Sequence, residues 1–196
     1  MKYIIFLFFI LTFHLSTAQN INYILKDVSS GMNEIKNYNK IDSLPKFYII
    51  DNSSFDSLMK SSTKKYKIIY NFSHKCSSSR EVLPKLLEFI SQNVTIFELY
   101  LIIGYRYDNV FDISNYLKNK IHFYEPAYFL DIKKYGKRKN PFSRLDKFIK
   151  QYCPQCEYRK MGFSSYFVFD KDNKIILHTN WEYDSNALVN ELKKLP

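Results

Sequence analysis

Apolar and polar positions fall into blocks that predict strands and helices in turn. The segments 66–72 and 94–103 are apolar enough to be buried strands of a sheet. Between them, five apolar residues recur at the spacing of one helix face: Val82, Leu83, Leu86, Leu87 and Ile90. Ser78 and Glu81 have the spacing of a capping box, so we expect this helix to begin there.

Weaker patterns predict further elements on both sides of this strand–helix–strand unit. We expect helices over 21–37, 55–60, 112–120, 143–152 and from Asp184 or Ser185 to Leu195. We expect extended segments over 46–50, 121–124, 165–169 and 174–178. The last two flank a turn in which Asn173 can adopt the left-handed conformation, which is typical of a hairpin. Strands that alternate with helices and end in a hairpin predict an α/β protein whose mixed sheet is covered on both faces.

The first residues have the pattern of a targeting signal. Lys2 precedes the apolar run 4–11, and the small residue Ala18 suits signal peptidase. The apolar run is too short for the roughly 30 Å hydrocarbon core of a bilayer, and no cysteine follows it directly, which argues against a lipoprotein anchor. We therefore expect residues 1–18 to be a cleaved signal peptide and the protein to be exported, to the periplasm or the outside.

Composition limits the class of protein and its partners. The chain has 196 residues, 46% of them hydrophobic, which suits one domain with a packed core rather than a disordered chain. The net charge is +10, and the densest basic cluster lies over 133–139. We expect a solvated basic loop there, with contact to a membrane surface or an acidic partner as the weaker alternative. Export argues against a nucleic-acid partner.

Three cysteines remain in a chain that we expect to enter an oxidising compartment. Because three is odd, at least one thiol is free or bonded to another molecule. Cys76 lies between a predicted buried strand and the start of a predicted helix. The helix dipole and the unpaired N–H groups at such a start stabilise a thiolate, and His74 and Lys75 add positive charge if they lie close. Cys76 is therefore the first candidate for chemistry.

A known family matches the residues around Cys76. The run CSSSREVLP, residues 76–84, resembles the C-x-x-C-R-x-x-x-P signature of exported thioredoxin-like thiol–disulfide oxidoreductases. Residues 162–174 look similar to the G-x-P-T-x-F-x-x-D-x-x-G-K hairpin of that family. The resemblance covers residues 44–196.

The resemblance implies a fold and a division of the chain. It implies a thioredoxin-like three-layer α/β sandwich with a mixed central sheet over 44–196. An N-terminal helical extension over 19–43 would precede this domain, and a basic, aromatic insertion over about 126–160 would come before the last hairpin.

Three positions depart from the family pattern. Ser79 stands where the resolving cysteine belongs, Lys75 replaces an aromatic residue, and Ser164 (or Phe163, if the alignment slips by one) replaces the cis-proline that faces the active site. The resemblance implies Cys76 and Ser79 as catalytic positions, and Lys75, Phe163 and Ser164 as substrate-binding positions. A serine can hydrogen-bond a thiolate but cannot resolve a mixed disulfide. We expect monothiol exchange with protein thiols or disulfides; the alternative is a redox-inactive module that binds a protein or peptide.

The remaining cysteines, Cys153 and Cys156, form a second C-x-x-C pair. Three alternatives stay open for it: a local structural disulfide, a second redox pair, or a pair that resolves Cys76. Zinc would need further ligands, and the sequence contains no second Cys/His pair at suitable spacing. We therefore expect neither a metal nor a cofactor.

Overall fold

The computed structural model describes residues 33–34, 45–136, 140–156, 161–180 and 185–195. The expected signal peptide and nearly all of the expected N-terminal extension lie outside these residues. In the described part of the chain, no helix is both long enough and apolar enough to cross a membrane.

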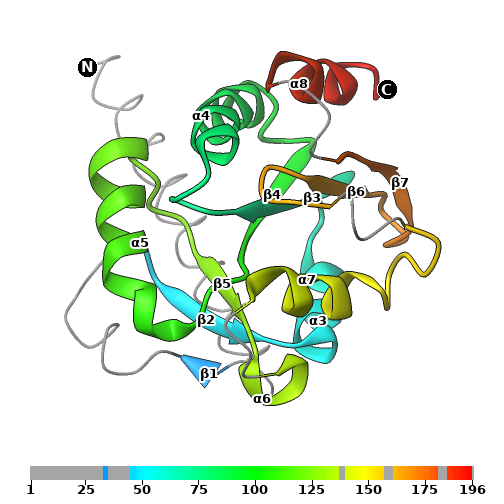
Figure 1. Cartoon of the computed structure of the whole chain (residues 1–196). Coiled ribbons are helices and arrows are strands. Elements are labelled where there is room, and N and C mark those ends of the chain that lie inside the picture. Colours follow the sequence, from blue (N-terminus) through cyan, green and yellow to red (C-terminus); the bar gives the residue numbers. More distant parts are fainter. Residues whose placement is uncertain (1–32, 35–44, 137–139, 157–160, 181–184, 196) are drawn as a thin grey trace, which may run out of the picture.

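One mixed sheet forms the centre of the described chain (Figure 1). Its seven strands lie in the order β1-β2-β5-β4-β3-β6-β7. Their bounds are β1 Asn33–Glu34, β2 Phe47–Ile50, β3 Tyr66–Phe72, β4 Phe97–Ile103, β5 Ala127–Leu130, β6 Tyr166–Phe169 and β7 Ile175–His178. Strands β2, β5, β4 and β3 are parallel, whereas β1, β6 and β7 pair antiparallel with their neighbours. The expectation of a mixed sheet is confirmed.

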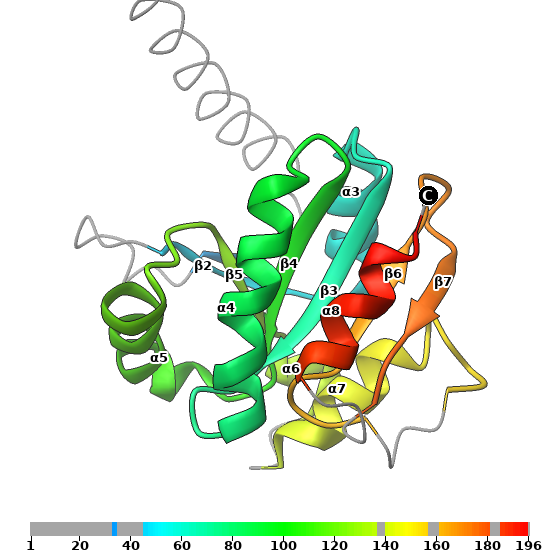
Figure 2. The ribbon, with the colours of Figure 1, turned by 90° about the horizontal axis from the view of Figure 1, so that it is seen from above.

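Helices cover both faces of this sheet (Figure 2). Their bounds are α3 Asn52–Ser61, α4 Ser77–Gln92, η2 Tyr107–Asn109, α5 Val110–Tyr116, the π-helical turn η3 Leu117–Ile121, α6 Ile132–Tyr135, α7 Pro141–Ile149 and α8 Ser185–Lys193. Successive residues of β3 point to opposite faces, so that Ile68 and Tyr70 pack with α4, α5 and α8, whereas Ile69 packs with α3 and α7. The result is the expected three-layer sandwich.

The structure corrects two local predictions. The helix expected over 21–37 falls almost wholly outside the described residues, and it is wrong at Asn33 and Glu34, which pair with β2 as strand β1. The extended piece expected over 121–124 is also wrong, because Ile121 ends η3 and His122 follows with φ 57°. The strand lies a few residues later, as β5.

Strand β5 falls inside the segment expected to be an insertion. It pairs with β2 on one side and with β4 on the other, so it is an interior strand of the sheet. All four of its residues are buried. The rest of that segment supplies α6, α7 and the second cysteine pair, which pack on the α3 face.

The closing hairpin is held to the sheet by a buried lysine. Lys67 of β3 is 1% exposed. Its Nζ donates to the carbonyls of Asp170 and Lys171, each at 3.2 Å, and to Asn173 Oδ1 at 2.8 Å. Asn173 has the expected left-handed conformation, with φ 61°. Burial lowers the pKa of Lys67, and the nearby carboxylates offset part of this decrease. The ammonium thus fixes the turn between β6 and β7.

Candidate functional site

The centre of the candidate site is the start of α4. The helix begins at Ser77 with Cys76 at its N-cap, and the Arg80 N–H donates to the Cys76 carbonyl at 3.1 Å. The capping box predicted from Ser78 and Glu81 is therefore wrong, because the helical hydrogen bonds start before Ser78. The N-cap side chain makes no capping hydrogen bond. A thiol accordingly occupies the place where a capping hydroxyl or carboxylate is usual.

Cys76 is a free, partly exposed thiol. Its backbone N–H donates to the Ser73 carbonyl at 3.3 Å, which closes a tight turn between β3 and α4. The Lys75 side chain is exposed, and its backbone N–H donates to Ser73 Oγ at 3.2 Å. The side chain of Cys76 thus lies at the positive end of the α4 dipole, where solvent and another sulfur can reach it.

Ser79, in the place of a resolving cysteine, is turned into the core. It is fully buried. Its Oγ accepts a hydrogen bond from the Ser73 N–H at 3.0 Å and lies 3.4 Å from the Tyr70 hydroxyl, which also donates to the Ser79 carbonyl at 3.0 Å. Burial raises the pKa of Tyr70, so its hydroxyl remains a donor. These bonds link the end of β3 to the first turn of α4.

Ser164 lies against that same turn. Ser78 Oγ donates to Ser164 Oγ at 3.1 Å, and the Ser164 N–H donates to the Asn71 carbonyl at 3.0 Å. Ser164 is 1% exposed and has φ 79°, a left-handed conformation that is uncommon for a residue with a Cβ. The loop before β6 therefore borders the α4 start, as the resemblance implied.

An aromatic cluster adjoins the turn that carries Cys76. We define it as His74, Tyr105, Phe142 and Phe163. The Tyr105 ring stacks on Phe163 with centroids 5.4 Å apart and lies 5.8 Å from His74, and Phe142 lies 4.8 Å from Phe163. The Tyr105 hydroxyl is hydrogen-bonded to Ser73 Oγ at 2.9 Å. Sequence reasoning missed Tyr105 and Phe142, because they come from the segment after β4 and from α7, and no motif marks them.

His74 is a neutral base at this site rather than a cation. Burial lowers its pKa, Lys75 and Arg80 lower it further, and Asp112 partly opposes them. Its Nδ1 is buried and has no hydrogen-bond partner among the described residues. The positive charge expected from His74 beside Cys76 is therefore small at neutral pH.

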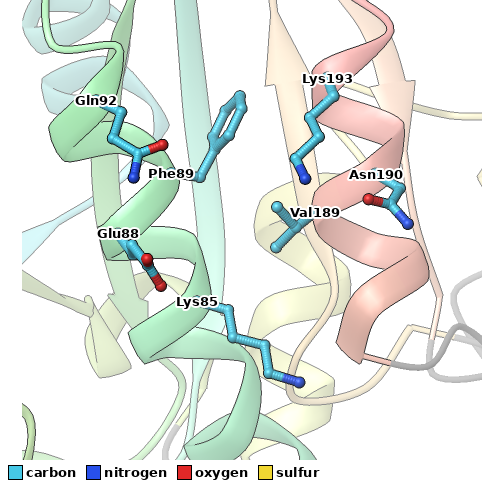
Figure 3. Close-up of a pocket in the computed structure, with 7 residues that line it drawn as sticks. All are labelled: Lys85, Glu88, Phe89, Gln92, Val189, Asn190 and Lys193. Carbon is cyan, nitrogen blue, oxygen red and sulfur yellow. The ribbon is translucent and has the colours of Figure 1, made fainter.

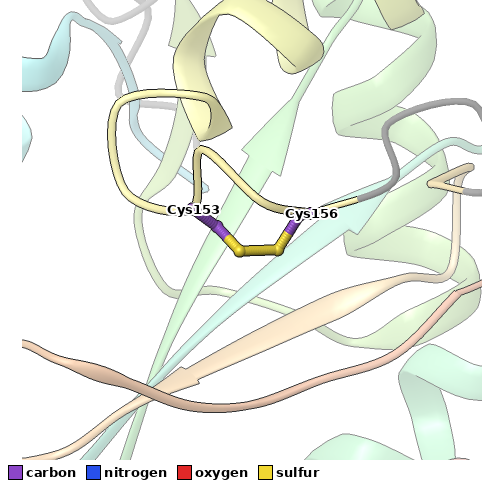
Figure 4. The surroundings of a disulfide bond; sticks show 2 residues. All are labelled: Cys153 and Cys156. Carbon is purple, nitrogen blue, oxygen red and sulfur yellow. A yellow bond between two sulfur atoms is a disulfide. The ribbon is translucent and has the colours of Figure 1, made fainter.

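Cys153 and Cys156 form a disulfide with each other after α7 (Figure 4). Both residues are buried in the cluster on the α3 face, opposite α4. The structure has the two cysteines bonded to each other, as both a local structural disulfide and the oxidised form of a redox pair require. His178 of β7 lies beside the pair, with the three side-chain ligand atoms all within 4.8 Å of one another. The sequence could not indicate this neighbour, because it comes from a separate strand.

Two hollows on the described part of the molecule lie away from Cys76. One, of about 460 Å³, separates α4 from α8 and is lined by Lys85, Glu88, Phe89, Gln92, Val189, Asn190 and Lys193 (Figure 3). The other, of about 340 Å³, lies at the start of β4, with Phe97 and Tyr100 among its lining residues. Since β3 and β4 are parallel, this second hollow lies at the end of the sheet opposite Cys76.

No model of a known protein family and no curated protein matches the sequence. Several solved structures are similar at low identity. A thioredoxin-like protein in its oxidised form is 15% identical with a TM-score of 0.48, over 74% of this chain and 82% of that chain. The thioredoxin domain of a thiol-disulfide oxidoreductase from Bacteroides vulgatus is 18% identical with a TM-score of 0.45, over 66% and 78%. An exposed lipoprotein thioredoxin from Streptococcus pneumoniae is 14% identical with a TM-score of 0.46, over 70% and 90%.

The topology of the chain itself characterises its fold. Four parallel strands are followed by an antiparallel hairpin, and the strand β3 leads through a cysteine into α4. Both features agree with what the signature around Cys76 implied. The chain has a thioredoxin-like fold.

Proposed function

We propose that this is an exported thioredoxin-fold protein that exchanges thiols and disulfides through Cys76 as its single nucleophile. The observation that carries the proposal is the position of this thiol, free and partly exposed at the N-cap of α4. The other two cysteines are bonded to each other. Thiolate stabilisation at a helix start favours attack on a disulfide.

The chemistry would proceed in two exchange steps. The Cys76 thiolate attacks one sulfur of a substrate disulfide, forms a new S–S bond with it, and expels the other sulfur as a thiolate, which takes a proton from water. A second thiol from outside the chain then attacks the mixed disulfide and restores the Cys76 thiolate. The hydroxyl of Ser79 cannot perform this second step, and it is already bound to the Ser73 N–H. The mixed disulfide should therefore persist until an external thiol arrives.

The surroundings of Cys76 suit a protein disulfide as substrate. Lys75 is exposed, and Phe163 belongs to the partly exposed aromatic cluster beside the turn. Ser164 joins this surface to the first turn of α4 through Ser78. We assign Lys75 and Phe163 to direct substrate contact, and the buried Ser164 to holding this substrate-binding surface against the first turn of α4.

The decisive experiment compares the natural thiol with one moved by a single residue. Oxidised glutathione is incubated with the reduced protein and with the double variant Cys76→Ser, Ser77→Cys, and glutathione adducts are followed by mass spectrometry across pH. Cys76 should react faster than the moved thiol by about tenfold or more at neutral pH, since only the N-cap position combines the dipole with the β3–α4 turn. Equal rates for the two thiols would refute the proposal.

The alternative function, a redox-inactive binding module, is favoured by the aromatic cluster, of which Phe142 is 39% exposed. The same variants separate the two functions. An inert Cys76, together with a Cys76→Ser variant that retains every interaction of the natural protein, would favour binding over exchange.

Export has its own test. Residues 1–18 should be absent from the mature protein, so N-terminal sequencing of the exported chain should begin at Gln19. A mature chain that still begins at Met1 would overturn this part of the proposal.

A further inference from the structure

Cys153, Cys156 and His178 form a group that the exchange chemistry of Cys76 does not use. The two cysteines lie in the turn after α7, and the histidine lies at the end of β7. Their sulfur and ring-nitrogen atoms all lie within 4.8 Å of one another. Two thiols and an imidazole are the ligands that Zn²⁺ prefers in proteins, and C-x-x-C is a common spacing for a zinc-binding pair. The side chains of these three residues therefore lie close to the positions that three zinc ligands would occupy.

We infer that these three residues form a zinc site that is closed while the disulfide is intact and opens when it is reduced. While the disulfide is intact, the two sulfurs are bonded to each other, so neither can bind a metal as a thiolate. In the reduced form, both sulfurs can ionise and bind the ion together with the imidazole of His178. The redox state of the pair thus decides whether a metal can bind.

The geometry requires little movement of the backbone. A tetrahedral zinc ion holds sulfur at about 2.3 Å and nitrogen at about 2.0 Å, which places ligand atoms roughly 3.5–3.8 Å from each other. The Cα atoms of the two cysteines are 5.3 Å apart. Rotation of the two side chains can therefore separate the sulfurs to that spacing. The turn is kept by hydrogen bonds from the Cys153 N–H to the Ile149 carbonyl at 2.9 Å and from the Cys156 N–H to the Cys153 carbonyl at 3.1 Å.

Burial gives the site a protected side and an open side. Cys153 and Cys156 are 1% and 4% exposed, whereas His178 is exposed. The His178 ring packs beside Phe167, with centroids 6.2 Å apart. The ion can enter from the solvent beside the histidine, and the fourth position is left to water. A site with three protein ligands and one open position is the arrangement of catalytic rather than structural zinc.

The chemical steps balance with a dithiol as reductant. A dithiol gives two electrons and two protons to the Cys153–Cys156 bond and itself becomes a disulfide. Binding of Zn²⁺ then releases the two thiol protons, because thiolates are the ligands. Reoxidation by an external disulfide, which takes two electrons from the thiolates and two protons from water and leaves as two thiols, restores the S–S bond and expels the ion.

The test uses the full chain with Cys76→Ser, so that no third thiol competes. The protein is reduced, separated from the reductant without oxygen, and titrated with Co²⁺ as a spectroscopic probe, followed by Zn²⁺. We expect one Co²⁺ per reduced chain with a thiolate-to-cobalt charge-transfer band, displacement by Zn²⁺, and no such band in the oxidised chain. Adding His178→Gln should weaken binding by about tenfold or more, whereas the matched control His122→Gln should leave it unchanged.

Several results would overturn the inference. These are a reduced chain without the charge-transfer band, an equal affinity after His178→Gln, or a band that is the same in the oxidised chain. Far-ultraviolet circular dichroism of the reduced chain supplies a further criterion. Loss of the folded spectrum on reduction would also refute the site, because only the folded sheet brings His178 to the cysteines.

Discussion

The hydroxyl of Ser79 should contribute measurably to stability, and Ser79→Ala removes only that hydroxyl. In the natural protein, Ser79 Oγ accepts the hydrogen bond of the Ser73 N–H at 3.0 Å. Both residues are buried, at 0% and 1% exposure. The variant leaves this N–H without its acceptor and without access to water. The Tyr70 hydroxyl keeps its bond to the Ser79 carbonyl.

The size of the effect follows from these contacts. A buried donor that loses its acceptor costs about 1–3 kcal/mol. Alanine is the better helix former, which offsets up to about 0.7 kcal/mol of that loss. The net loss in the free energy of unfolding should be about 1–2 kcal/mol. For a chain of this size, the melting temperature should fall by roughly 2–8 °C.

Urea unfolding followed by circular dichroism measures this loss. Ser77→Ala is the matched control, because Ser77 is the exposed first residue of the same helix and its replacement should change stability by less than about 0.5 kcal/mol. If the two variants were equally stable, the proposed role of the Ser79 hydroxyl as a buried acceptor would be wrong. A loss confined to Ser79→Ala would support its assignment to the structure of the turn.

Three further outcomes are expected. Ser79→Cys should form an intramolecular disulfide with Cys76, so that mass spectrometry no longer detects an accumulated glutathione adduct. Lys67→Met should lower the free energy of unfolding by about 1–3 kcal/mol, since the turn carbonyls lose their donor, whereas the exposed control Lys171→Met should have little effect. The pKa of His74 is lowered in the folded state, so unfolding takes up a proton: stability should fall as pH drops below the ordinary histidine value of 6.5. In urea titrations, His74→Gln should weaken this dependence, and an unchanged slope would contradict it.

Local patterns predicted the elements on which Cys76 depends. The strand β3 has the predicted bounds, and α4 was recognised from its apolar face, because both signals lie within a short stretch of sequence. The hairpin turn was indicated by Asn173 for the same reason. These features require no knowledge of distant residues.

Predictions that depended on distant contacts were the ones that failed or were missed. The strand β5 has only four residues, and its place between β2 and β4 is determined by pairing across the sheet. The start of α4 was misplaced because a capping-box pattern at Ser78 competes with the turn that Ser73 and Tyr70 stabilise. His178 could not be assigned to Cys153 and Cys156, because strand β6 and the hairpin turn come between them along the chain and no spacing rule links them.

The sheet order also sets constraints on the order of folding. The strand β2 has two neighbours, the edge strand β1 and the much later β5, so its longer pairing forms only after β5 is available. A buried hydrogen bond from the Asn52 N–H to the Tyr135 hydroxyl joins these regions across 83 positions of sequence. Closing so long a loop is slow compared with pairing β3 with β4. A chain that folds as it emerges from a membrane would therefore keep β2 without its partner β5 until most of the domain has followed, and pulsed hydrogen exchange should detect protection of β3 and β4 before β2.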